Sequence, residues 1–546
     1  MANVVHNMTD YEQTYAEFKW EVPEYFNFAG DIIDKWAKDP DKLAMWWVDD
    51  AGNEEKRTFL DFSVASKKVA NMLTQQGVKR GDVVIVMLPR YLAWWEIFIA
   101  CLRMGALIAP ATTQLTPKDI QYRINTAEAV CFITDNANAP KLEEVQAECP
   151  TLKTKIVVGG ARDGWLTYEE ERAAATGEFE TARTRSDEDA IIYFTSGTVG
   201  YPKMTLHTHS SYPIGHMITG KFWIDLKPED LHWNLSDTGW AKAAWSSFFG
   251  SWYCGAAQFV HHSLRFDPKK TLEFLQKYPI TTMCGAPTNY RMMVLEDLSQ
   301  YKFPTLRHCV GAGEPLNPEV IEVWKKAFGL TIRDGYGQTE TVLICGNFPP
   351  IEPRYGSMGK PSPGFDLQVI DENGNILPPN AEGDIAIRVR PQRPVGLFKE
   401  YWKDPERTAS VYRGDWYITG DRAYRDEDGY FWFVGRADDV ILTSGYRIGP
   451  FEVESALIEH PAVAESAVVS SPDEVRGEVV KAFVILAPGY QPSDELVKEL
   501  QEHVKKVTAP YKYPRKIEFV ESLPKTISGK IRRIELRERE WAGKRK

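Results

Sequence analysis

Cysteine is scarce in this sequence, and the few cysteines stand far apart. The chain has 546 residues and seven cysteines, with no CxxC pair and no Cys/His pattern at ligand spacing. A structural zinc site or a disulfide framework needs such spacings. The seven residues are therefore expected to be buried or free thiols in a reducing compartment.

A long uninterrupted apolar run is also missing. The most apolar stretch, YLAWWEIFIACLRMGALIAPAT, is interrupted by Glu96 and Arg103, and we predict a helix, a turn at Gly105 and a strand there rather than a membrane span. The first twenty residues contain three acidic residues and no basic region followed by an apolar stretch, which argues against a secretory signal or a transit peptide. We expect a cytoplasmic protein with no membrane span.

An excess of positive charge is absent as well. The net charge is −11, which argues against a nucleic-acid partner bound through its phosphates. Hydrophobic residues make up 43% of the chain and charged residues 26%, as in ordinary globular proteins. The length predicts roughly three or four domain-sized units.

Short β-branched runs alternate with helical stretches over the first two thirds of the chain. This alternation predicts an α/β fold with parallel sheets covered by helices. Proline and glycine become dense after about residue 350 and short strands follow, which indicates a β-rich subdomain. A last α+β unit of about a hundred residues lies within the usual domain range. We predict a large domain over 1–437 and a small one over 438–546.

One loop has the composition of a phosphate-binding site. The stretch YFTSGTVGYPKM, residues 193–204, follows a predicted strand and ends on a lysine. Its glycines allow close backbone approach, while N–H groups, hydroxyls and the lysine can all bind phosphate oxygens. The spacing differs from that of the P-loop. The candidate residues are Thr195, Ser196, Gly197, Thr198, Gly200 and Lys203.

Four further motifs are weak singly. DGYGQTE (334–340) offers Glu340 to Mg²⁺, and YITGD (417–421) offers Asp421 to ribose hydroxyls. GRADDVILTSGYRIGP (435–450) and LPKTISGKIRR (523–533) are rich in charged residues and glycine. Alone, each is as well explained by an exposed turn or a solvated charge.

Together, and in this order, the five motifs resemble those of the adenylate-forming superfamily, which includes acyl-CoA synthetases, peptide-synthetase adenylation domains and luciferases. The resemblance covers nearly the whole chain. The stretches SDTGWAK and HTHSSYPIGHMITGKFWIDLKPED are similar to the medium-chain acyl-CoA synthetases. It implies an AMP-forming ligase that uses ATP, Mg²⁺ and coenzyme A, with a mobile C-terminal domain.

The resemblance also implies roles for individual residues. Lys530 would bridge the acyl carboxylate and the phosphate oxygens, Thr339 would contact the α-phosphate or the carboxylate, and Glu340 would bind Mg²⁺. Asp421 and Arg436 would hold the ribose, and Asp438 would be the hinge. The remaining candidates for ATP or CoA are Gln114, Gly313, Glu314, Pro315, Asp334, Gly335, Tyr336, Gly337, Gln338, Ser444, Gly445, Tyr446, Arg447, Arg476 and Lys505.

Two residues bear on the acid. Relatives that take acetate tend to carry a bulky tryptophan where this chain has Gly337, so the glycine is expected to leave the acyl pocket open. Trp240 would lie near the mouth of the channel. We therefore expect a medium-chain, branched or aromatic carboxylic acid.

Other functions stay open at this stage. The activated acid could pass to a carrier protein or be oxidised as in a luciferase, or the chain could be a non-catalytic binder of acyl groups or nucleotides. The intact motif residues favour an enzyme. The pairs His207/His209 and His261/His262 lack accompanying carboxylates at ligand spacing, so they are given no role. A monomer and a homodimer are both compatible with the sequence.

Overall fold

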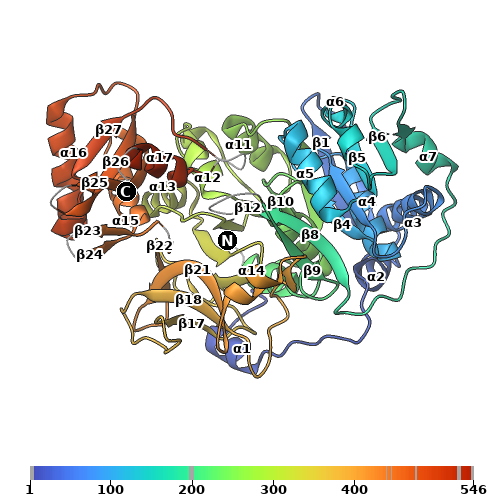
Figure 1. Cartoon of the computed structure of the whole chain (residues 1–546), viewed down its shortest axis with the longest axis horizontal. Helices are drawn as coiled ribbons and strands as arrows, with labels where there is room; N and C mark the ends of the chain where they lie inside the picture. Colours follow the sequence, from blue (N-terminus) through green and yellow to red (C-terminus); the bar gives the residue numbers. More distant parts are fainter. Residues whose placement is uncertain are drawn as a thin grey trace.

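The computed structural model describes residues 5–195, 202–437, 439–443, 446–473, 476–525 and 530–542. Figure 1 shows two sheet-and-helix layers on one side, a smaller β-subdomain below them, and the C-terminal elements gathered at the other end. The predicted architecture, an α/β fold with a β-rich subdomain and a separate small domain, is confirmed. Within the described residues, no helix is long and apolar enough to span a membrane.

The first layer is a nine-stranded sheet in the order β16-β15-β14-β13-β12-β10-β11-β1-β2. The strands from β1 to β14 pair in parallel, and the edge strands β2, β15 and β16 are antiparallel. Their bounds are β1 Leu43–Asp49, β2 Glu54–Thr58, β10 Leu231–Asn234, β11 Ala257–His262, β12 Thr282–Gly285, β13 His308–Ala312, β14 Ile332–Gly337, β15 Leu343–Gly346 and β16 Lys360–Pro361. The linking helices are α11 Pro268–Lys277, α12 Pro287–Met293 and α13 Pro318–Phe328.

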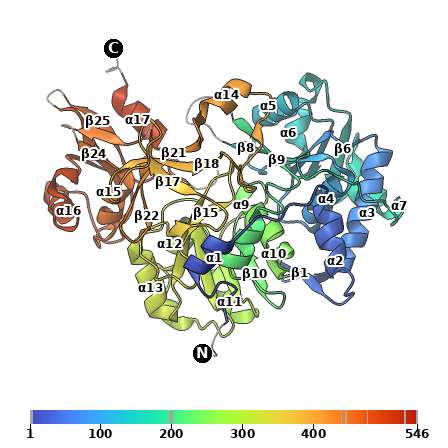
Figure 2. The same ribbon diagram turned by 90° about the horizontal axis from the view of Figure 1, so that it is seen from below.

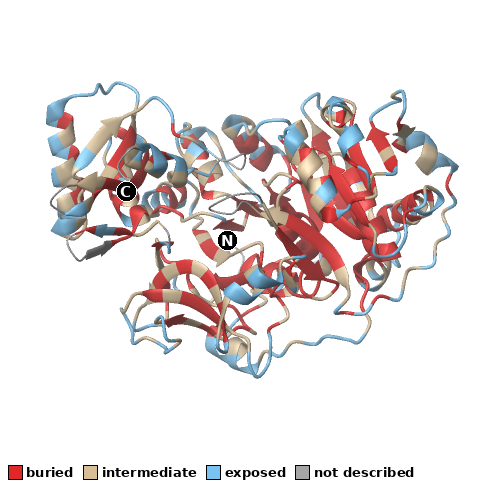
Figure 3. Cartoon of the chain, in the orientation of Figure 1, coloured by how far each residue is buried: buried red, intermediate tan, exposed pale blue. Residues whose placement is uncertain are grey.

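The second layer is an eight-stranded sheet in the order β19-β9-β8-β4-β3-β5-β6-β7. Its strands are β3 Val83–Met87, β4 Leu107–Pro110, β5 Cys131–Asp135, β6 Thr154–Val158, β7 Leu166–Thr167, β8 Asp189–Thr195, β9 Lys203–Thr208 and β19 Glu400–Tyr401. Its helices are α3 Phe59–Gln75, α4 Leu92–Met104, α5 Pro117–Ala127, α6 Ala139–Glu143 and α7 Tyr168–Ala174. Figure 3 shows the strands of both layers buried and the outer helices exposed on one face.

The apolar stretch that contains α4 is a core element, as predicted. Gly105 ends the helix in the left-handed region with φ 74°, a conformation that suits glycine. The two interrupting charges are buried but paired: Arg103 contacts Asp34 at 2.7 Å, and Glu96 accepts from Tyr168 Oη at 2.6 Å. The seven cysteines are free, as expected.

Shorter helices lie between the longer elements, and one of them passes close to a neighbouring helical turn. A Cβ on Gly220 would lie 2.2 Å from the carbonyl oxygen of Gly250, so only glycine fits there. These short elements are α1 Tyr11–Glu17, η1 Ala29–Ile33, α2 Asp34–Trp36, η2 Gln146–Glu148, α8 His216–Ile218, η3 Thr219–Trp223, α9 Ala241–Ala244, η4 Trp245–Phe249, α10 Gly250–Tyr253, η5 Leu298–Gln300 and α14 Pro405–Ser410.

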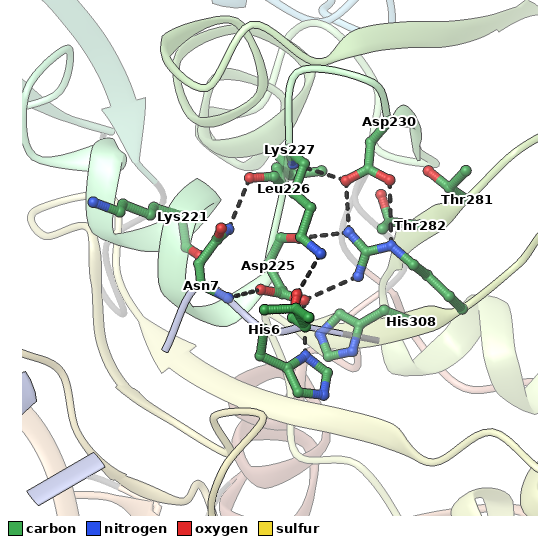
Figure 4. A network of polar contacts seen from close by, with 12 residues as sticks. His6, Asn7, Lys221, Asp225, Leu226, Lys227, Asp230, Thr281, Thr282 and His308 are labelled. Atoms are coloured by element: carbon green, nitrogen blue, oxygen red, sulfur yellow. Dashed lines mark hydrogen bonds and ion pairs between the residues drawn. The ribbon is translucent and has the colours of Figure 1, made fainter. Parts of the chain in front are cut away.

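The N-terminal segment is anchored to the first layer by a buried carboxylate (Figure 4). Asp225 accepts from the Asn7 amide at 2.7 Å, and its Oδ2 lies 2.9 Å from His6 Nδ1 and 3.0 Å from Arg307. Arg307 also binds Asp230 at 2.6 Å. The first described residues are therefore fixed to the domain core.

The β-subdomain is a five-stranded antiparallel sheet, as expected from the short strands after residue 350. Its strands are β17 Leu367–Ile370, β18 Gly383–Arg388, β20 Tyr412–Arg413, β21 Trp416–Arg425 and β22 Phe431–Arg436.

The C-terminal unit has its own apolar cluster, built on Val453, Leu457, Val468 and Leu500. It lies at one end of the molecule in both ribbon views (Figure 2). Its elements are β23 Ile441–Thr443, β24 Tyr446–Ile448, α15 Pro450–Ile458, β25 Val463–Asp473, β26 Gly477–Leu486, α16 Asp494–Val507, η6 Pro510–Lys512, β27 Lys516–Phe519 and α17 Arg533–Trp541. The helix α17 was not predicted. The boundary between residues 437 and 438 stays a prediction, since Asp438 lies outside the described residues.

Candidate active site

The candidate metal ligand and the lysine of the phosphate loop lie side by side. Glu340 is 8% exposed, and its Oε1 accepts from Tyr401 Oη at 2.7 Å and lies 3.7 Å from Lys203 Nζ. Burial lowers the pKa of Lys203, while Glu340 acts in the opposite direction. A single carboxylate that shares its ion with substrate phosphates is a usual environment for Mg²⁺. The residues present therefore fit that ion.

The turn that contains Thr339 is fixed by hydrogen bonds to its backbone. The Thr339 carbonyl accepts from Tyr212 Oη at 2.6 Å and lies 2.7 Å from His207 Nε2. Burial lowers the pKa of His207 to about 3, so the ring is neutral and can donate from Nε2. His207, which was given no role from the sequence, thus supports the turn that presents Thr339 and Glu340.

The predicted ribose-binding pair is assembled. Asp421 accepts from Tyr336 Oη at 2.5 Å and from Gln338 Nε2 at 2.7 Å, and lies 3.2 Å from Arg436 Nε. Burial raises the pKa of Asp421, and Arg436 opposes that shift. Strands β14, β21 and β22, with Gln338 directly after β14, therefore bring one acid, one base and two hydrogen-bond donors to one point.

The resemblance implies that residues 311–315 and 334–336 border the adenine, and this group, called the adenine wall below, lies at the end of β13 and within β14. Burial opposes ionisation of Glu314, but Arg291, 3.0 Å away, and Thr288 outweigh it and lower the pKa of Glu314. Burial raises the pKa of Asp334 to about 8, although the Gly335 amide, which donates to its carboxylate at 2.9 Å, acts to lower that pKa. The wall also includes Gly313 and Pro315 in the turn after β13.

Lys530 reaches this site from the C-terminal unit. Loss of solvation within the surrounding protein lowers the pKa of Lys530. Arg436 adds to this shift, and Glu314 and Asp421 oppose it. These three neighbours belong to the adenine wall and the ribose pair. The residues that act electrostatically on Lys530 thus belong to the large domain, and the role of this lysine in adenylation stays a prediction.

Among the described residues, no hydrogen bond or ion pair joins Lys505, Arg476, Gln114 or Trp240 to Glu340 or Asp421. Lys505 donates to Glu502 at 2.6 Å, and Arg476 lies in the turn after β25. Within the part of the chain that the structure describes, no hydrogen bond or ion pair joins Lys505 to Arg476. Gln114 lies after β4, and Trp240 precedes α9. Residues Ser196, Gly197, Thr198, Gly200, Asp438, Ser444 and Gly445 lie outside the described residues, and of Tyr446 and Arg447 only the backbone is described. Strand β8 ends at Thr195, directly before the loop.

The space directly beside Gly337 is filled by protein atoms, and the expectation that this glycine leaves the acyl pocket open stays a prediction. A Cβ at Gly337 would lie 2.3 Å from the Val342 carbonyl oxygen and 2.5 Å from Cη2 of Trp245. The glycine therefore makes room for an indole that arrives from η4, rather than for substrate alone. Local sequence gives no signal of this contact, because the two residues come from different motifs.

Lys242 was also missed, although it lies in the motif SDTGWAK. Its Nζ donates to the Gly285 carbonyl at 2.8 Å and to the Ala312 carbonyl, at the ends of β12 and β13. Burial lowers the pKa of Lys242. The charge of Lys530 lowers it further, whereas Glu314 and Asp334 act to raise it. A lysine next to small residues in an apolar, aromatic stretch was the only available signal.

Comparison with known proteins supplies an independent line of evidence. The AMP-binding enzyme family matches residues 33–402, and the AMP-binding enzyme C-terminal domain matches residues 452–530. The human mitochondrial acyl-coenzyme A synthetase ACSM3 is 55% identical over 98% of this chain and 93% of its own length. Human mitochondrial ACSM4 is 54% identical over 96% of this chain and 92% of its own.

Solved structures agree. The anthranilate CoA ligase AuaEII in complex with anthranoyl-AMP is similar with a TM-score of 0.88 and 31% identity, over 95% of this chain and 98% of that one. A benzoate CoA ligase from Burkholderia xenovorans has a TM-score of 0.83 and 29% identity, over 94% and 100% of the two chains.

These findings correct one expectation. The curated relatives are designated mitochondrial, which contradicts the cytoplasmic location expected from the first twenty residues. Composition near one end of a chain was the whole basis of that expectation. It carries less weight than similarity over nearly the full length.

Proposed function

The chain belongs to the AMP-binding enzyme family and is an AMP-forming acyl-CoA synthetase that uses ATP, Mg²⁺ and CoA. From that premise we propose which residues act in its adenylation step: Lys203, Thr339, Glu340, Asp421 and Lys530. The observation that supports these roles is convergence. Motifs spread from residue 203 to residue 530 meet around Glu340 and Asp421 in the folded chain.

In the first half-reaction, a carboxylate oxygen of the acid attacks the α-phosphorus of ATP. A new P–O bond forms, the bond to the β-phosphate oxygen breaks, and pyrophosphate leaves. Two anions must meet, so fixed positive charges aimed at the α-phosphate lower the barrier. Lys203 and Lys530 would provide such charges. Mg²⁺ held by Glu340 would neutralise phosphate oxygens.

The ribose would be oriented by Asp421. A carboxylate has about four acceptor positions, and Asp421 uses three of them on Tyr336, Gln338 and Arg436. Ribose hydroxyls would occupy what is left or replace one of these donors. Thr339, held by its carbonyl from behind, would then direct its hydroxyl to the α-phosphate.

In the second half-reaction, the thiol of CoA gives up its proton to solvent and its sulfur attacks the acyl carbonyl. A C–S bond forms and AMP leaves with the electron pair of the C–O bond. We propose that the small domain, starting at residue 438, rotates about Asp438 for this step. Ser444, Gly445, Tyr446 and Arg447 would then face the nucleotide. Arg476 and Lys505 would bind the phosphates of CoA, and Gln114 would lie along the nucleotide site.

The acid is proposed to be of medium length, branched or aromatic. The residue at 337 cannot be a bulky one, since Trp245 already fills the space beside it. The acyl pocket would therefore end on the Trp245 indole, with Trp240 at its mouth. The aromatic acids named for the two solved CoA ligases are consistent with such a pocket.

The test of the site assignment separates the two half-reactions. We expect Lys530→Ala to reduce pyrophosphate release by about 100-fold or more, as loss of one preorganised charge does in other enzymes. The same variant should still convert supplied acyl-adenylate and CoA to product. Lys525→Ala is the matched control, because Lys525 lies in the same segment but binds Glu465 at 2.8 Å. Equal loss of both half-reactions in Lys530→Ala would refute the assignment.

A further inference from the structure

Only two of the three N–H groups of the Lys242 ammonium have a hydrogen-bond partner among the described residues. A lysine ammonium has three N–H groups, and two of them point to the carbonyls of Gly285 and Ala312. Among the residues that the structure describes, no carboxylate oxygen lies within 4.0 Å of Lys242 Nζ, since no ion pair involves it. One N–H donor of Lys242 is thus left over, and within the described part of the chain the ammonium has no carboxylate partner.

The position of this charge is inside the active site. If Gly313 carried a Cβ, that atom would lie 4.0 Å from Lys242 Nζ and 3.9 Å from its Cδ, with no other group within 4 Å. Gly313 follows β13 in the predicted adenine wall, so Lys242 borders the same open space from the side of α9. Lys530 acts on Lys242 electrostatically and so lies near it.

Neither of the two carboxylates of the adenine wall forms an ion pair with Lys242. Glu314 is already bound to Arg291 at 3.0 Å, and burial favours the neutral form of Asp334 by raising its pKa to about 8. Removing a cation from water without a counter-ion is costly. An enzyme whose reactants are anions can supply the missing partner with its substrate.

We propose that Lys242 is a second cation of the reaction centre, which binds an anionic oxygen of the reactants together with Lys530. The oxygen belongs either to the α-phosphate or to the acyl carboxylate, and both have the same chemistry toward an ammonium. This inference rests on the proposed function, because it needs the acid and the nucleotide to meet at this point.

The alternative is a purely structural role. By bridging the Gly285 and Ala312 carbonyls, Lys242 could simply hold the ends of β12 and β13 together. That role does not depend on the charge of a ligand. Loss of the lysine would then disturb the adenine wall and weaken charged and neutral ligands alike.

The test compares charged and neutral ligand pairs by calorimetry with Lys242→Met. AMP is paired with adenosine, and octanoate with octanamide. Because a charge-assisted hydrogen bond contributes more than a neutral one, we expect AMP or octanoate to bind about 10- to 100-fold more weakly and their neutral partners to change by less than about twofold. Selective loss for AMP assigns the α-phosphate, and selective loss for octanoate assigns the carboxylate.

Two further variants keep the test decisive. Lys242→Gln keeps an amide donor for a strand carbonyl but removes the charge, and should show the same selective loss if Lys242→Met folds poorly. Lys221→Met removes an exposed lysine of η3 and should change nothing. Equal weakening of charged and neutral ligands, or no weakening at all, would overturn the proposal. Failure of the unmodified enzyme to bind AMP would instead overturn the proposed function.

Discussion

The contact between Gly337 and Trp245 gives a prediction whose size can be worked out. In Gly337→Ala, the new Cβ would lie 2.3 Å from the Val342 carbonyl oxygen and 2.5 Å from Trp245 Cη2. An ordinary C···O contact is about 3.3–3.6 Å, so the β14 end or the Val342 segment must move by about 1 Å. Overpacking of this kind costs about 1–3 kcal/mol, which corresponds to a fall in Tm of several degrees, about 2–4 °C per kcal/mol.

The same change should alter the choice of acid. The Trp245 indole can move only into the acyl pocket or out of its own packing, so we expect Gly337→Ala to favour shorter acids in kcat/KM. Thermal unfolding and a chain-length series would measure the two effects. Gly177→Ala is the matched control, because its Cβ would meet only Lys68 and Val64, at 3.9 and 4.0 Å. Unchanged Tm and unchanged chain-length preference in Gly337→Ala would refute the reasoning.

Two further predictions concern buried carboxylates. Glu340→Gln should reduce adenylation strongly and raise the Mg²⁺ concentration needed for half-maximal rate, whereas Tyr401→Phe, which keeps the charge, should reduce the rate less; equal losses would argue against a metal ligand at 340. For Asp334, the pKa is raised from 3.8 to about 8, so its contribution to stability is fully present below pH 3.8 and is lost as the pH rises through about 8. The unfolding free energy of the wild type relative to Asp334→Asn should therefore fall between pH 4 and pH 8, and a constant difference over that range in chemical denaturation would contradict the assigned shift.

The sequence predicted those features that depend on local spacing. The strand before the phosphate loop, the helix, turn and strand around Gly105 and the helix over 494–507 are all formed. Glycine, proline and β-branched residues act on their immediate neighbours, so such elements can be predicted from a short window. The convergence of Asp421 with Tyr336 and Gln338 was anticipated only through the resemblance of the motifs.

The parts that were missed depend on tertiary contacts. Whether Gly337 opens a pocket depends on Trp245, which belongs to η4, and the role of His207 depends on the Thr339 carbonyl beside it. Lys242 gains its position from the ends of two strands that follow it in the chain. None of these partners can be inferred from residue spacing, because many side chains compete for each contact until the fold selects one.

The most direct test of the account is release of AMP and pyrophosphate with a panel of acids, each with and without CoA. The panel should run from acetate to dodecanoate and include 2-methylbutyrate, benzoate and phenylacetate. The account predicts CoA-dependent AMP release that is highest between butyrate and decanoate, or on a branched or aromatic acid. A preference for acetate would contradict the proposed pocket, and pyrophosphate release that is indifferent to CoA would contradict transfer of the acyl group to CoA.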